Sequence, residues 1–180
     1  MYETLKSETV FDGKLLKLEL LEIDVGSGRT ASREIVRHAG AVAALARIPD
    51  GRFVFVRQFR KAVEKELLEI VAGRLEPGEQ PELCARRELK EETGYDVAEL
   101  YSLGGVYNAP GYCSEKLYLF FAELRAERGA QACDEDEHVT VVLLSASEFE
   151  AQVAAGRIED AKTLAAWLAF EKMKTGGTES

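Results

Sequence analysis

Three glutamates, Glu88, Glu91 and Glu92, have the spacing in this sequence that most clearly points to chemistry. On a helix, positions i, i+3 and i+4 bring side chains to one face, within several ångströms of one another. Because like charges repel at this spacing, a cation between the carboxylates would stabilise the helix. Carboxylates without His or thiolate partners favour hard cations, typically a partly hydrated Mg²⁺ that also contacts phosphates, and Mn²⁺ can substitute. The alternative is a solvated, glutamate-rich helix face without a ligand.

The residues around these glutamates extend the pattern in both directions. Gly73 precedes Glu79 by six positions, and the run Arg87-Glu88-Leu89-Lys90-Glu91-Glu92-Thr93-Gly94-Tyr95 follows. Together they resemble the Nudix box, GX5EX7REUXEEXGU, in which U is a bulky aliphatic residue. Tyr95 departs from the pattern at its last position, where an aromatic ring can still pack as an apolar side chain. A chance match in a chain of this length is on the order of 10⁻⁷ to 10⁻⁶, which argues against a structural α/β domain that matches by accident.

Resemblance to the Nudix family implies an α/β/α sandwich around a mixed β-sheet, with a loop and a helix presenting glutamates to metal ions. The positions that match the family's metal ligands are Glu88, Glu91, Glu92 and the carbonyl group of Ala72. Arg87 and Glu79 are similar to supporting residues. An arginine one residue before a ligand does not share its helix face, so Arg87 is expected to pair with a carboxylate that orients the cluster. Gly73 and Gly94 are expected to serve backbone geometry.

Hydrolysis of a diphosphate also needs a group that accepts a proton from the attacking water. A metal beside a diphosphate can neutralise oxygen charge, orient the bond and lower the pKa of a bound water. The acidic segment Asp134-Glu135-Asp136-Glu137 is the best source of a base in the rest of the chain, and both Glu135 and Glu137 are candidates. A solvated acidic turn is the alternative. Resemblance to ADP-ribose pyrophosphatases, which take a base or further metal ligand from such a loop, favours the catalytic interpretation.

The resemblance to ADP-ribose pyrophosphatases extends outside the box. It includes the segments Val56–Arg60, Leu68–Gly73, Tyr107–Gly111 and Gly156–Thr163, and a proline 15 residues after Tyr95. It implies hydrolysis of ADP-ribose to AMP and ribose 5-phosphate. The expected substrate-binding residues are Arg60, Arg57, Glu69, Pro110, Gly111 and Glu115. A guanidinium suits phosphate oxygens because it donates two parallel hydrogen bonds, although either arginine can also be an ordinary surface cation.

Other functions remain open from the sequence. The substrate can instead be GDP-mannose or another nucleotide sugar, NADH or a dinucleoside polyphosphate, because the residues that select it lie outside the box. A non-catalytic Nudix domain that binds a nucleotide and regulates another protein is an alternative of a different class. Such a module could lose its metal ligands, whereas Glu88, Glu91, Glu92 and Arg87 are all present.

Several other segments must position these residues. Alternating apolar residues predict a small antiparallel sheet over residues 3–38, with a turn at 26–28. Pro81 and Gly94 predict a helix over 81–93, and the glycine-bearing stretch 72–78 predicts a loop. Further strands are predicted at 41–48, 52–58, 66–71, 97–106, 116–124 and 139–144, and further helices near 147–155 and 160–173.

Composition limits the classes of partner. The chain has 180 residues and a net charge of −9, and this sign repels nucleic-acid backbones and anionic lipid. No apolar run is long enough for a membrane span, and no secretory signal precedes the first strand, so a cytoplasmic enzyme with a small nucleotide substrate is expected. Residues 1–39 are expected to form a β region for dimerisation, 40–175 the Nudix hydrolase domain and 176–180 a frayed tail. The homodimer rests on the family resemblance, because the same sheet could pack on its own chain.

Overall fold

The computed structural model describes residues 2–133 and 138–176, which form two compact units. The first, here called the sheet unit, contains the chain up to Gly40 together with Tyr107–Lys116. The second, here called the sandwich unit, contains Ala41–Val106 and the chain from Leu117 onward. No helix in the described part of the chain is long and apolar enough to cross a membrane.

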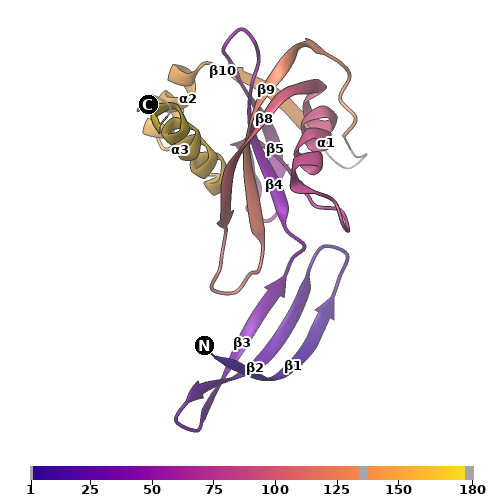
Figure 1. Cartoon of the computed structure of the whole chain (residues 1–180), viewed down its shortest axis with the longest axis vertical. Helices are drawn as coiled ribbons and strands as arrows, with labels where there is room; N and C mark the ends of the chain where they lie inside the picture. The colour runs from indigo at the N-terminus through magenta and orange to yellow at the C-terminus, as the bar shows by residue number, and fades with distance from the viewer. Residues whose placement is uncertain (1, 134–137, 177–180) are drawn as a thin grey trace. The chain divides into compact units, whose positions relative to one another are not determined.

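The sandwich unit is built on a seven-stranded mixed sheet (Figure 1). Its main order is β10-β5-β4-β9-β8, with β6 paired to β5 and β7 paired to β4. The pair β4–β9 is parallel, whereas β4–β5, β4–β7, β5–β6 and β5–β10 are antiparallel. The strands are β4 (Ala41–Arg47), β5 (Phe53–Arg60), β6 (Lys65–Glu69), β7 (Val71–Arg74), β8 (Tyr95–Tyr107), β9 (Lys116–Arg128) and β10 (Val139–Leu144).

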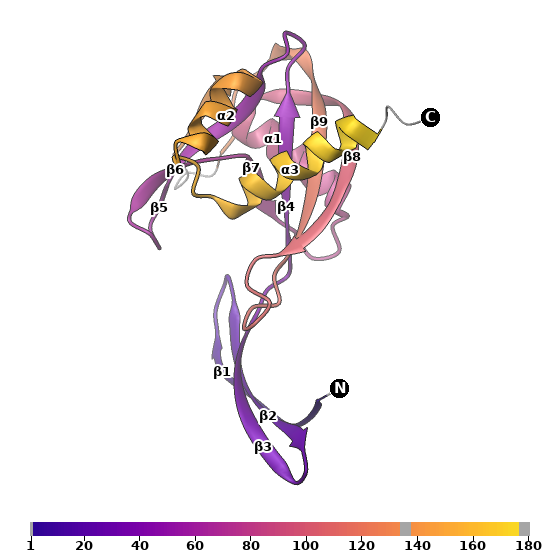
Figure 2. The same cartoon turned by 90° about the vertical axis from the view of Figure 1, so that its left-hand side faces the viewer.

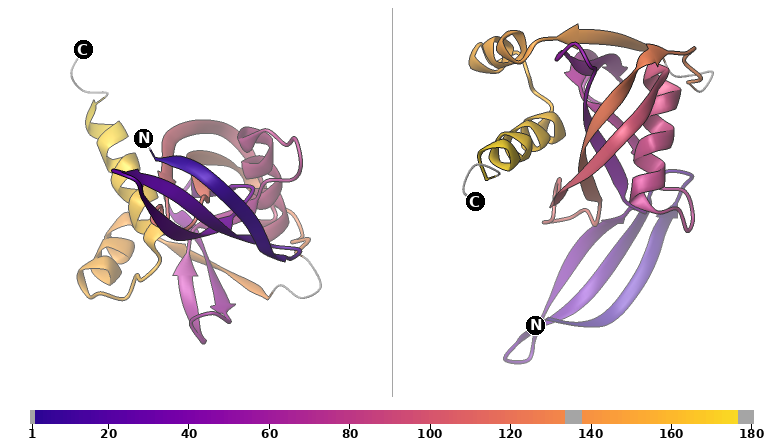
Figure 3. Two further views of the ribbon diagram at one scale, coloured as in Figure 1. Left: turned by 90° about the horizontal axis from the view of Figure 1, so that it is seen from below. Right: turned by 45° about the horizontal axis from the view of Figure 1, so that its top comes forward.

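Helices cover both faces of this sheet, as the right-hand view of Figure 3 shows. Successive β4 residues alternate between two cores: Ala43 and Leu45 join one, while Val42 and Ala44 join the other. The first core is completed by α2 (Ala146–Ala154) and α3 (Ala161–Gly176), through Phe149, Trp167 and Phe170. The second is completed by α1 (Pro81–Thr93), through Cys84, Ala85 and Leu89. This arrangement confirms the predicted α/β/α sandwich.

Helix α1 begins and ends as predicted from its sequence. Pro81 lies in its first turn, where the missing N–H is not needed for the helix. Gly94 follows with φ of 78°, a left-handed conformation that favours glycine, and donates its N–H to the carbonyl of Lys90. A Cβ atom on Gly94 would also stand 2.3 Å from the carbonyl oxygen of Gly129. The helix therefore ends at Thr93, and only glycine fits at the residue that follows it.

The prediction of a loop over 72–78 is wrong for its first residues. Strand β7 continues through Gly73 to Arg74 and pairs with Ala41–Ala44 of β4. Local composition favoured a loop, but the pairing partner is about thirty residues away in the sequence, and tertiary pairing overrides a weak local preference. Strands β8 and β9 and helix α3 also extend beyond their predicted ends, α3 as far as Gly176.

The sheet unit contains the predicted small antiparallel sheet, in the order β1-β2-β3. Its strands are β1 (Glu3–Asp12), β2 (Lys17–Gly26) and β3 (Arg29–Arg37). Ile23 is the single buried residue of these strands, all of which the structure describes. The segment Tyr107–Lys116 joins this unit along β3, since Val36 donates to the Tyr112 carbonyl and accepts from the Ser114 amide. The assignment of residues 1–39 to dimerisation stays a prediction.

Candidate active site

Helix α1 comes very near the sheet at Gly73. A Cβ atom built on Gly73 would stand 1.8 Å from Cδ of Glu88, so only glycine leaves room for this carboxylate. The next residue also binds the helix, because the Arg74 carbonyl accepts hydrogen bonds from Cys84 Sγ at 3.3 Å and Arg87 Nη2 at 3.3 Å. Gly73 therefore acts through its small size, and the glycine and Glu88 of the box pattern meet in space.

Arg87 connects three glutamates of the box. Its Nε and Nη2 donate to the two carboxylate oxygens of Glu79, each at 3.0 Å. Its Nη1 donates to Glu88 at 2.7 Å and to Glu91 at 3.0 Å. Arg87 was expected to lie off the helix face of Glu88, but its side chain reaches the Glu88 carboxylate. The pairing expected for Arg87 thus extends to three carboxylates.

Electrostatics keep this group charged. The two hydrogen bonds from Arg87, with a further one from the Glu76 amide, lower the pKa of Glu79 to about 2. The same pairing with Glu79, supported by Glu88 and Glu91, raises the pKa of Arg87. Burial, followed by a hydrogen bond with Glu79, raises the pKa of the Cys84 thiol to about 12. Cys84 therefore stays protonated near neutral pH and is a poor nucleophile.

The predicted metal ligands lie on two neighbouring elements, Glu88, Glu91 and Glu92 on α1 and Ala72 on β7. Glu92 is buried, and Glu88 and Glu91 are held by Arg87. Within residues 2–133 and 138–176, no three His, Cys, Asp or Glu side chains stand close enough to hold a metal ion as they are placed. The predicted ligands fit a hard divalent cation, because they are carboxylate and carbonyl oxygens. Gly73 lacks a Cβ and so leaves room for the Glu88 carboxylate beside β7.

The carboxyl end of α1 is anchored to the segment that leads toward the acidic residues. The Ala132 amide donates to the Glu91 carbonyl at 2.8 Å, and Arg128 Nε donates to the Thr93 carbonyl at 2.8 Å. These bonds satisfy carbonyl groups that a helix end leaves without partners. The two candidate bases, Glu135 and Glu137, lie outside the described residues, so their catalytic role stays a prediction.

Two of the predicted substrate-binding residues form an ion pair. Arg60, at the end of β5, donates through Nε and Nη2 to the two oxygens of Glu69, both at 2.8 Å. The pair lies within electrostatic reach of α1: the hydrogen bonds that Arg60 donates to Glu69 are the main cause of the raised pKa of Arg60, and the charge of Glu92 contributes to it. Glu69 is only 1% exposed, and its role in substrate binding stays a prediction, as does that of Arg60. Arg57 is exposed on the same strand.

The remaining predicted substrate residues, Pro110, Gly111 and Glu115, belong to the sheet unit. There, Glu115 accepts a hydrogen bond from Asn108 Nδ2 at 2.7 Å, and His38 Nδ1 lies 3.6 Å from its other oxygen. Their roles in substrate binding stay predictions.

Three residues without a predicted role, Asp160, Lys162 and Thr163, lie around Glu69 and Ile70. They lie in the segment Gly156–Thr163, one of those that resemble ADP-ribose pyrophosphatases. The resemblance marked this segment, but no residue pattern indicated which strand it contacts, because 93 positions separate Lys162 from Glu69.

Known proteins resemble this chain over the same residues that form the candidate site. The NUDIX domain matches residues 37–168, which include the whole box and most of the sandwich unit. The chain belongs to the Nudix hydrolase family. A "methanol dehydrogenase activator" of Bacillus methanolicus is 40% identical over 165 residues, which cover 91% of this chain and 89% of the relative. An "ADP-ribose pyrophosphatase" of Bacillus subtilis (strain 168) is 40% identical over 162 residues, covering 89% of this Nudix chain and 88% of the relative.

A solved structure supports the fold. The crystal structure of an "ADP compounds hydrolase" superposes with a TM-score of 0.85, covering 99% of this chain and 97% of that one. Its sequence is 23% identical, so the likeness concerns the architecture. These relatives support hydrolysis of a nucleoside diphosphate derivative by this Nudix protein.

Proposed function

We propose that this Nudix hydrolase is a Mg²⁺-dependent ADP-ribose pyrophosphatase that produces AMP and ribose 5-phosphate. The observation that carries the proposal is the packing of Glu88 against Gly73, beside Arg87 and Glu91 on α1. The Bacillus subtilis relative, named for this reaction and 40% identical over most of both chains, supports the choice of substrate.

The metal would be held by Glu88, Glu91 and Glu92, with the Ala72 carbonyl as a further ligand. When bound, Mg²⁺ neutralises diphosphate oxygens and lowers the pKa of a coordinated water. Arg87 keeps its bidentate contact with Glu79 and so remains an anchor for α1 when Glu88 and Glu91 turn toward a cation. Mn²⁺ is expected to substitute, because it prefers the same oxygen ligands.

The chain's own residues supply the other steps. Glu137 or Glu135 accepts the proton of the attacking water as the general base. Arg60 donates to diphosphate oxygens through the part of its guanidinium that does not contact Glu69, and its side chain is 38% exposed. Arg57 is a second cation on β5, and Pro110, Gly111 and Glu115 are further proposed substrate-binding residues.

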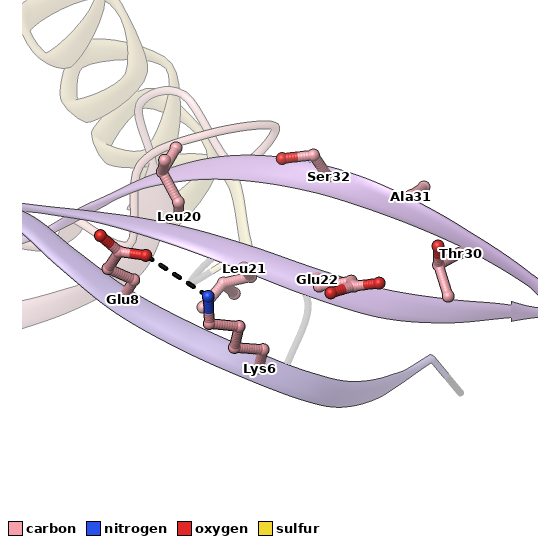
Figure 4. Close-up of a pocket in the computed structure, with 8 residues that line it drawn as sticks. All are labelled: Lys6, Glu8, Leu20, Leu21, Glu22, Thr30, Ala31 and Ser32. Carbon is pink, nitrogen blue, oxygen red and sulfur yellow. Dashed lines mark ion pairs between the residues drawn. The ribbon is translucent and has the colours of Figure 1, made fainter.

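A homodimer is the proposed assembly, with the sheet unit as its interface. Apolar side chains such as Phe11, which is 56% exposed, lie on strands that bury almost nothing within the chain. Figure 4 shows a pocket on this sheet, bounded by Leu20 and Leu21 and by the ion pair between Lys6 and Glu8. A second copy is the occupant that the family resemblance implies. Light scattering would test this, since a monomer at micromolar concentration contradicts it.

Turnover of a substrate panel tests the proposed reaction. The panel contains ADP-ribose, GDP-mannose, NADH and a dinucleoside polyphosphate, each with Mg²⁺ and with excess EDTA. Metal-dependent release of AMP and ribose 5-phosphate from ADP-ribose is expected. If the enzyme hydrolyses another compound of the panel faster, that compound replaces ADP-ribose as the proposed substrate, and the metal-dependent mechanism stands.

Single substitutions test the residue roles. Glu88→Gln and Glu92→Gln should each lower kcat by about a hundredfold or more, because a charged ligand is lost. Full activity of both variants would refute the metal assignment. Glu135→Gln and Glu137→Gln, compared side by side, should show which glutamate is the base, since only that variant loses the acidic limb of the pH profile, the fall in activity as the base is protonated.

A regulatory Nudix domain is the second candidate function. It is favoured by the relative named as a methanol dehydrogenase activator, which is 40% identical to this chain. The retained carboxylates and Arg87 favour hydrolysis, since binding alone does not require them. Absence of turnover across the whole panel would support the regulatory alternative.

A further inference from the structure

The first turn of α3 binds two consecutive residues, Glu69 at the end of β6 and Ile70, which lies between β6 and β7. Thr163 Oγ1 accepts the Ile70 N–H at 2.9 Å, and Lys162 Nζ donates to the carboxylate of Glu69. Asp160 organises both, since its Oδ1 accepts from Lys162 at 2.9 Å and its Oδ2 accepts from the Thr163 amide at 3.0 Å. Figure 2 shows the start of α3 beside β6 and β7. Glu69 is therefore held from the helix side as well as by Arg60.

The Glu69 carboxylate accepts hydrogen bonds from two cationic side chains, Arg60 and Lys162. It is 1% exposed and accepts both prongs of Arg60 at 2.8 Å, while Lys162, only 12% exposed, donates to the same carboxylate. Burial alone would raise the pKa of Glu69, but the donors Arg60 and Lys162 outweigh it and lower that pKa. A carboxylate fixed on both sides has one orientation, and a bidentate guanidinium must align with its plane. Glu69, itself held by Lys162, thereby sets the orientation of the Arg60 guanidinium.

The group contains two cations and two carboxylates, because Lys162 pairs with Asp160 as well as with Glu69. Asp160 also faces the amino end of α3, whose backbone carries partial positive charge. Lys162 and the amino end of α3 therefore offset the negative charge of Asp160 and part of that of Glu69. Arg60 is the member of this group that is partly open to solvent, at 38% exposure, and so retains attraction for an anion.

We propose that Lys162 is a positioning residue for substrate: acting through Glu69, it orients the Arg60 guanidinium toward the diphosphate of the bound nucleotide. This inference rests on the proposed function, because it takes a diphosphate as the group that Arg60 contacts. Lys162 does not contact substrate and has no direct part in the metal-assisted step.

A double-mutant cycle tests the proposal in the full-length protein. Lys162→Met should raise KM for ADP-ribose about tenfold with kcat within about twofold, the pattern of lost binding that is equal in ground and transition states. Arg60→Met should show the same type of change. If Lys162 acts through Arg60, adding Lys162→Met to Arg60→Met should raise KM no further. Calorimetric binding of ADP-ribose in EDTA should follow the same order in Kd.

Lys65→Met is the matched control. It removes one lysine from the neighbouring ion pair with Glu159, whose members are each about half exposed, and should leave KM and kcat unchanged. Circular dichroism identifies folded variants. If Lys162→Met does not fold, Lys162→Gln, which removes the positive charge and shortens the side chain away from Glu69, enters the same cycle with the same expected rise in KM.

Three results would overturn the inference: an unchanged KM in the Lys162 variant, a full additional increase in the Arg60→Met background, or a loss confined to kcat. Failure of the proposed function has a different signature. In that case the wild-type protein neither hydrolyses nor binds ADP-ribose, whereas failure of this inference leaves the wild type active.

Discussion

The two units of this chain show how differently a β-sheet behaves with and without covering layers. In the sandwich unit, β4 buries six of its seven residues, between α1 on one face and α2 with α3 on the other. In the sheet unit, every residue of β1 is exposed. An isolated three-stranded sheet gains little from apolar burial, whereas a covered one excludes water and strengthens polar contacts inside it. Buried groups such as Glu69 and Thr163 therefore occur in the sandwich unit, and substitutions there should have the larger effects.

The largest contrast is expected for phenylalanine in the two units. Phe149 is fully buried and stacks on Phe55 with ring centroids 4.6 Å apart. Phe149→Ala should lower the free energy of unfolding by about 4 kcal/mol, because it removes apolar contacts and leaves a cavity. Phe11→Ala should cost less than about 1 kcal/mol in dilute protein, since its ring is exposed within the chain. Urea unfolding measures both.

Equal losses in these two variants would contradict the comparison. A loss for Phe11→Ala that increases with protein concentration would instead indicate that a second copy covers the sheet, because association stabilises by mass action.

The second contrast concerns glycines whose missing side chain leaves room for a neighbour. Gly73→Ala would drive a Cβ into Glu88, whose position is restricted by Arg87, and should lower kcat/KM about a hundredfold. Gly13→Ala also creates a close approach, 2.5 Å from Cε1 of Phe11, but that exposed ring can move. The second variant should therefore keep wild-type kinetics.

Gly129→Ala is a control inside the sandwich unit, because its Cβ would meet nothing closer than 3.4 Å. Full activity of Gly73→Ala would show that Glu88 does not need its observed position for turnover.

These residues also show what could be predicted from the sequence. Helix α1 was predicted to the residue, because Pro81 and Gly94 are local signals that depend only on their own backbone. The helical positions of the three glutamates were predicted because their spacing depends only on α1, while their role as metal ligands stays a prediction. Strand β7 was missed because its glycine favours a loop locally, while β4 supplies the hydrogen bonds.

The contact of Lys162 with Glu69 could not be predicted either. It depends on how α3 packs against the sheet, and neither residue carries a local signal for the other. Long-range ion pairs of this kind require the fold as well as the sequence.

The third contrast compares two threonine hydroxyls. Thr163 is buried and its Oγ1 accepts the Ile70 N–H at 2.9 Å, so Thr163→Val should lower the free energy of unfolding by about 2 kcal/mol by leaving that amide without its acceptor. Thr163→Ser keeps the hydroxyl and should recover most of the loss. Thr9→Val, on exposed β1, should change stability by less than about 0.5 kcal/mol. Chemical denaturation of the three variants would reveal whether burial decides the outcome, and equal values for Thr163→Val and Thr9→Val would deny it.

The smallest contrast is a pH dependence. Glu79 has its pKa lowered from 4.5 to about 2, first by hydrogen bonds from Arg87, so the folded state binds protons less tightly than the unfolded state. Its contribution to stability is therefore complete above pH 4.5 and is lost as pH falls toward 2. Because the pair is partly open to solvent, the contribution should be on the order of 1 kcal/mol.

Glu79→Gln should then be less stable than the wild type at pH 7, and the difference should shrink between pH 4.5 and pH 3. Glu8→Gln removes an exposed partner 3.6 Å from Lys6 and should show no comparable difference. Urea unfolding at each pH distinguishes the two pairs, and a difference for Glu79→Gln that persists undiminished at pH 3 would mean that it comes from packing and not from the charge held by Arg87.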